Sequence, residues 1–140
     1  MNEDQRTLDK ISQINEMLSV IANDKHRIEC LRFVTLALIS LMRLKIKNEK
    51  PVELKLEYGE CLHWIKIYGW FFYGALTKKV FNQWGLKDGR DFIRTIEFLT
   101  EKNIFSKDSF QSKFSISYVS SNFNFKEYES QDFFDSYSNI

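Results

Sequence analysis

Proline, glycine, histidine and cysteine are all scarce in this chain of 140 residues. It has one proline, five glycines, two histidines and two cysteines. So few cysteines argue against the disulfide framework that stabilises many small secreted domains. The glycines form neither a GxGxxG nor a GxxxxGKS/T phosphate loop, and no GxSxG nucleophile elbow is present. We therefore expect a protein that is not an enzyme and needs no cofactor.

Long hydrophobic runs are also missing. The longest uncharged apolar run extends from Phe33 to Met42, well short of the roughly 20 residues that a membrane-spanning helix requires. The first residues, MNEDQRTLDK, are acidic and polar, unlike a signal peptide. We expect a cytoplasmic protein without a membrane span, in which Cys30 and Cys61 are reduced and buried. The alternative that the sequence leaves is a disulfide between these two cysteines.

The histidines and cysteines do not form a convincing metal site. His26 and Cys30 are four residues apart, whereas Cys61 and His63 are two apart. Zinc ligands usually come as C-x2–4-C and H-x3–5-H pairs, which these mixed pairs do not match. No third residue can be named to orient a Cys–His nucleophile either. We interpret all four as packing or surface residues and predict no bound metal.

Charge is unevenly distributed, although the net charge is only +1. Residues 25–59 and 76–115 are basic, whereas residues 1–24 and 116–140 are acidic. A basic body with acidic ends is typical of a protein that faces a polyanion, and scatter over a solvated surface is the alternative.

Hydrophobic periodicity predicts two N-terminal helices. Leu8, Ile11, Ile14, Leu18 and Ile21 lie on one stripe of a helix over residues 5–22. A second helix over 25–47 is apolar on most sides, so it is either central to the fold or part of an interface. We predict that the pair 5–47 forms a dimerisation element of a homodimer, with Leu38 and Leu41 in the interface.

The middle of the chain predicts three further elements. Residues 52–58 alternate between apolar and charged, which is typical of a strand. The start of a helix is the alternative for so short a segment. Residues 60–84 read as two helices with a break near Gly69 to Gly74. Asp88 is placed to cap a helix over 89–102, and Asn103 to end it.

The hydrophobic pattern changes from helical spacing to alternation in the C-terminal quarter of the chain. Residues 112–127 alternate as in a β-hairpin, and residues 128–140 are acidic, which predicts a mobile tail. The predicted fold is therefore α+β and helix-dominated, with four to five helices and a small C-terminal β-hairpin. We expect one globular domain over residues 1–127.

Aromatic residues are the most concentrated feature. Core packing is the simplest interpretation, but tryptophan and tyrosine are also enriched at binding hot spots. The predicted partner or dimer interface consists of Trp64, Tyr68, Trp70, Phe71, Phe72 and Tyr73, with Phe133 and Phe134 of the tail.

Residues 75–119 resemble the core of a winged-helix domain. A short helix from Thr77 to Trp84, a turn at 85–87 and a second helix over 89–102 precede a hairpin in the place of the wing. The resemblance implies binding to double-stranded DNA, with the second helix in the major groove. The nucleic-acid-binding residues that it implies are Lys78, Lys79, Lys87, Arg90, Arg94, Lys107 and Lys113.

Two functions of different classes follow. The first is a small non-enzymatic adaptor or inhibitor that acts through a protein partner, and the alternative is a DNA-binding transcriptional regulator. Arg90 and Arg94 favour DNA binding, whereas Glu97, Glu101 and the near-zero net charge favour a protein partner. We favour the protein partner.

Overall fold

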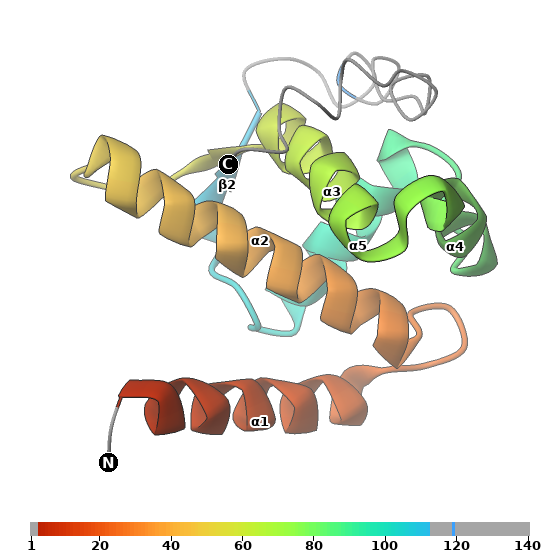
Figure 1. The fold of residues 1–140 in the computed structure, drawn as a ribbon, viewed down its shortest axis with the longest axis horizontal. Helices are drawn as coiled ribbons and strands as arrows, with labels where there is room; N and C mark the ends of the chain where they lie inside the picture. Colours follow the sequence, from red (N-terminus) through yellow and green to blue (C-terminus); the bar gives the residue numbers. More distant parts are fainter. Residues whose placement is uncertain (1–2, 113–118, 120–140) are drawn as a thin grey trace.

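The computed structural model describes residues 3–112 and residue 119, and helices dominate it. The helices are α1 (Glu3–Ile21), α2 (Ile28–Glu49), α3 (Tyr58–Tyr73), α4 (Thr77–Gln83) and α5 (Gly89–Glu101), with 3-10 turns η1 (Gly74–Leu76) and η2 (Lys107–Ser109). The strands are β1 (Leu56–Glu57) and β2 (Phe110–Gln111). The predicted helix-dominated α+β class is confirmed (Figure 1).

Helix α2 is the centre of the fold. It packs against α1, α3 and α5, and eight of its side chains are buried. Leu38 is fully buried and Leu41 nearly so, because both point into this chain's own core. Packing within one chain therefore explains the burial of both leucines, which corrects their assignment to a dimer interface. The apolar breadth of the helix reflects its three neighbours within one chain.

An aromatic cluster fills the space between α2, α4 and α5. The ring of Phe81 lies 5.5 Å from that of Phe33 and 5.0 Å from that of Phe92, both measured between centroids. The ring of Trp84 adds contacts with Phe33 at 5.5 Å and with Phe81 at 6.1 Å. Tilted and edge-on arrangements at such separations are the favourable ones for aromatic pairs. Phe81 and the adjoining Trp84 therefore attach helix α4 to α2 and α5.

Helix α1 lies at the edge of the molecule, beside α2 (Figure 1). Leu18 is its one fully buried side chain among those described, residues 9–21, whereas Ile14 and Ile21 are half-buried. Met17 and Val20 are exposed. Leu18, Ile14 and Ile21 of the predicted stripe thus pack against the core, and Leu18 is the most deeply buried of the three.

The two strands join distant parts of the chain. Leu56 pairs with Phe110 and Glu57 with Gln111, in parallel. The alternation over 52–58 thus ends in a strand of two residues that leads directly into α3. Lys45 supports this corner, since its Nζ donates to the carbonyl oxygen of Lys55 at 2.8 Å and to Glu60 Oε1 at 2.6 Å.

Local signals place the other helix ends. Helix α3 continues through Gly69 and ends at Gly74, whose φ of 54° suits glycine. Asp88 accepts a hydrogen bond from the backbone N–H of Asp91 at 3.1 Å, as a capping residue does. Asn103 ends α5 in the left-handed region with a φ of 63°.

At the start of α2, Asn23 accepts hydrogen bonds from the backbone N–H groups of Lys25 and His26, but the helix starts only at Ile28. The predicted hairpin over 112–127 lies outside the described residues except for 112 and 119, and the predicted tail over 128–140 lies wholly outside them.

Both thiols are buried and free. Burial raises the pKa of Cys30 to about 12, and it also raises the pKa of Cys61. Within the described part of the chain, no three histidine, cysteine or acidic side chains gather as metal ligands. None of the described helices is both long and apolar enough to span a membrane.

Candidate interaction surfaces

The aromatic residues of α3 divide into two groups. Phe71 and Phe72 are 56% and 63% exposed, and Leu76 in the next turn is 61% exposed. These three form what we call the α3 apolar surface. The other predicted interface residues, Trp64, Tyr68, Trp70 and Tyr73, are half-buried. The predicted set thus contains Phe71 and Phe72 of this surface but not Leu76, and its members Trp64, Tyr68 and Tyr73 pack against the core.

Tyr68 and Tyr73 connect this surface to the core. The ring of Tyr68 lies 5.5 Å from Phe33 and 4.9 Å from Phe72, whereas Tyr73 lies 5.7 Å from Phe33. Desolvation raises the pKa of both tyrosines above the ordinary value, because each hydroxyl is partly removed from water. The ring of Phe72 therefore packs against Tyr68 on one side, although most of its surface is exposed to solvent.

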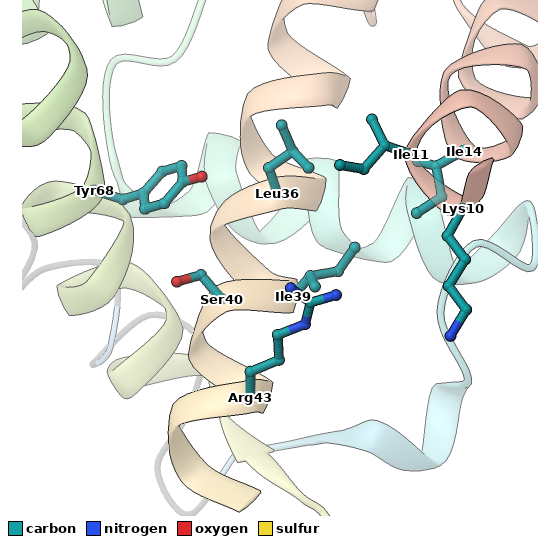
Figure 2. A pocket seen from close by; sticks show the side chains of 8 residues that line it. All are labelled: Lys10, Ile11, Ile14, Leu36, Ile39, Ser40, Arg43 and Tyr68. Atoms are coloured by element: carbon teal, nitrogen blue, oxygen red, sulfur yellow. The ribbon is translucent and has the colours of Figure 1, made fainter. Parts of the chain in front are cut away.

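A groove runs between α1 and α3, with α2 as its floor. Figure 2 shows its larger cavity, of about 440 Å³, in which Leu36 and Ile39 of α2 face Ile11 and Ile14 of α1. Tyr68 of α3 lies on the opposite side of α2. The full lining is Lys10, Ile11, Ile14, Leu36, Ile39, Ser40, Arg43 and Tyr68.

A second cavity continues the groove toward the start of α2. It measures about 280 Å³ and shares Leu36 and Tyr68 with the first. Its lining is Glu29, Arg32, Phe33, Leu36, Tyr68, Phe72 and Tyr73. Because Phe72 belongs to this lining, the α3 apolar surface and the groove are continuous. We call the two cavities together the α1–α3 groove.

The lining of the groove is predominantly basic. Lys10, Arg32 and Arg43 are opposed by Glu29 alone. Glu29 Oε2 lies 3.7 Å from Nε of Arg27, so its charge is already offset. Arg32 donates from Nε to Asn15 Oδ1 at 3.0 Å, a neutral partner that leaves the positive charge in place.

The residues implied by the winged-helix resemblance lie on exposed positions. Helices α4 and α5 begin and end within a residue of the predicted helices, and a short turn joins them. All of the described cations in the set, Lys78, Lys79, Lys87, Arg90, Arg94 and Lys107, are exposed. Glu97 and Glu101 are exposed on α5 as well. Lys113, Phe133 and Phe134 lie outside the described residues.

Most residues of the groove are absent from the site predicted from the sequence. Lys10, Ile39, Ser40 and Arg43 are not among the predicted site residues, and the spacing of Ile11 and Ile14 predicts only a packing stripe. One signal was available, since Leu36, Ile39, Ser40 and Arg43 follow helical spacing on a face separate from that of Leu38 and Leu41. That face is now seen to be the one that α2 leaves half-exposed.

Comparison with known proteins gives no match. No protein family matches the chain, and neither a curated protein nor a solved structure resembles it significantly.

Proposed function

We propose that this protein is a non-enzymatic interaction protein that binds a protein partner through the α3 apolar surface and the adjoining groove. The observation that carries the proposal is the exposure of Phe71, Phe72 and Leu76, three large apolar side chains within six residues. Single exposed apolar residues are ordinary, but adjoining ones beside a groove are typical of interaction sites. Aromatic anchors of this kind commonly dominate binding energy.

A photo-activated cross-linker tests this proposal. We expect a phenylalanine analogue placed at Phe72 to give a discrete covalent product in cells that make the protein, because the partner would cover this ring. The control places the same analogue at Glu101, which is exposed on α5. In a pull-down, Phe71→Ser/Phe72→Ser should weaken capture about tenfold or more, as expected when aromatic anchors are removed.

The result that contradicts the proposal is identical labelling at Phe72 and Glu101, or no product at either. A product of twice the chain mass would identify the partner as a second copy, the homodimer predicted from the sequence. Circular dichroism of the double variant shows whether lost capture reflects a lost surface rather than a lost fold.

DNA binding by α4 and α5 is the second candidate function. The observation in its favour is the exposure of Lys78, Lys79, Lys87, Arg90 and Arg94 on a helix–turn–helix unit at the positions that the winged-helix resemblance implies. Basic residues there would contact phosphates or base edges. Glu97 and Glu101 on the same helix would repel phosphates, which is why this candidate ranks second.

Binding to random double-stranded DNA across a salt series tests the second candidate. If α5 contacts DNA, log affinity should fall with log salt with a slope of about −0.9 per phosphate contact, and Arg90→Glu/Arg94→Glu should abolish binding. Lys47→Glu/Lys50→Glu makes the same charge change at the far end of α2 and should leave binding nearly unchanged. Absence of binding at low salt from the folded protein would end this hypothesis.

A further inference from the structure

We infer that the α1–α3 groove binds an acidic amphipathic helix of a partner protein. This inference rests on the proposed function and specifies the chemistry of the partner. Three features of the groove support it, namely its length along α2, its apolar walls and the sign of its charge.

The length of the groove suits a helix. On α2 its lining runs from Glu29 to Arg43 through Arg32, Leu36 and Ser40, which follow one stripe of the helix. Fourteen residues separate the two ends, and at 1.5 Å per residue they span about 21 Å, the length of about four helical turns. The larger cavity is lined by α1, α2 and α3, and the smaller one by α2 and α3. An apolar groove that follows a helix in this way is a common receptor for an amphipathic helix.

Apolar side chains are available along that length. Ile11 and Ile14 form the wall on α1, Leu36 and Ile39 the floor, and Phe72 the far end on α3. The two cavities, of about 440 and 280 Å³, share Leu36 and Tyr68 in their linings. Two such cavities would hold large side chains that repeat every three or four residues on a bound helix.

The positive charge of the groove favours a partner helix that carries negative charge. Lys10 of α1 and Arg43 of α2 line the larger cavity from two sides (Figure 2). Among the described residues neither has an acidic partner within ion-pair distance. A helix with glutamate or aspartate beside its apolar stripe would neutralise these cations, whereas a basic helix would be repelled.

Binding of two synthetic helical peptides to the full chain tests the inference. Each peptide has fourteen residues with leucine at positions 1, 4, 8 and 11, and the remaining positions alternate alanine with glutamate in one peptide and with lysine in the other. Fluorescence anisotropy should show that the chain binds the glutamate peptide and prefers it over the lysine peptide. Lys10→Glu/Arg43→Glu should weaken the glutamate peptide about tenfold and reverse the preference.

The control is Lys87→Glu/Lys107→Glu, which changes the net charge equally at two exposed positions outside the groove. An unchanged preference after Lys10→Glu/Arg43→Glu, or an equal effect of the control, would overturn the inference. A second variant, Ile39→Gln, should weaken both peptides, because a neutral polar side chain replaces the apolar one on the floor of the groove. Cross-linking at Phe72 is independent of these results, so the proposed function can hold while the acidic partner is rejected.

Discussion

Phe81→Ala should lower the free energy of unfolding by about 3–5 kcal/mol, the cost typical of removing a buried phenylalanine. Its ring is fully buried and contacts Phe33, Trp84 and Phe92, so its loss leaves a cavity where α2, α4 and α5 meet. Domains of this size are typically stable by only about 5–15 kcal/mol. One substitution should therefore remove a large part of the total stability.

Urea denaturation followed by tryptophan fluorescence measures this loss. The matched control is Phe71→Ala, which removes the same ring from an exposed position on α3 and should change stability by less than about 0.5 kcal/mol. Similar urea midpoints of unfolding for the two variants would show that the aromatic cluster does not attach α4 and α5 to α2.

Leu18→Asp should detach α1 and leave the rest of the fold in place. Leu18 is fully buried, whereas Ile14 and Ile21 are only partly covered, so most of the contact between α1 and α2 is lost with it. A buried, unpaired carboxylate costs several kcal/mol, and the helix avoids this cost by moving away from α2. Since α1 forms one wall of the groove, binding of the glutamate peptide should be lost too.

Hydrogen exchange resolved by residue distinguishes detachment from global unfolding. The amides of α1 should lose their protection, while those of α2, α3 and α5 keep it. Val20→Asp makes the same chemical change two residues away, on a side chain that is 83% exposed, and should leave protection unchanged. Loss of protection throughout the domain would mean that α1 is an integral part of one cooperative core.

Local signals in the sequence predicted much of the fold. Asp88 and Asn103 mark the ends of α5 as predicted, and Ile93, Ile96 and Leu99 are buried at helical spacing between them. Such features depend on neighbours three or four residues away, which the sequence displays directly. The helix-dominated class could be predicted for the same reason.

Long-range features could not be predicted in this way. The sequence showed that α2 is apolar on most sides, but not whether α3 and α5 or a second copy covers Leu38 and Leu41. The groove likewise depends on where α1 crosses α2, and no periodicity within one helix encodes that position. The same limit explains why Lys10 and Arg43, distant in sequence, were not recognised as neighbours of one cavity.

The pairing of β1 with β2 has a consequence for synthesis on the ribosome. Leu56 cannot meet Phe110 until all three helices between them have been made and the partner strand has left the exit tunnel. Parallel contacts between distant segments form late in folding because closing the long intervening loop costs entropy. Helix α2 therefore lacks its packing against α5 until late in translation, and the domain can reach its final form only after β2 emerges.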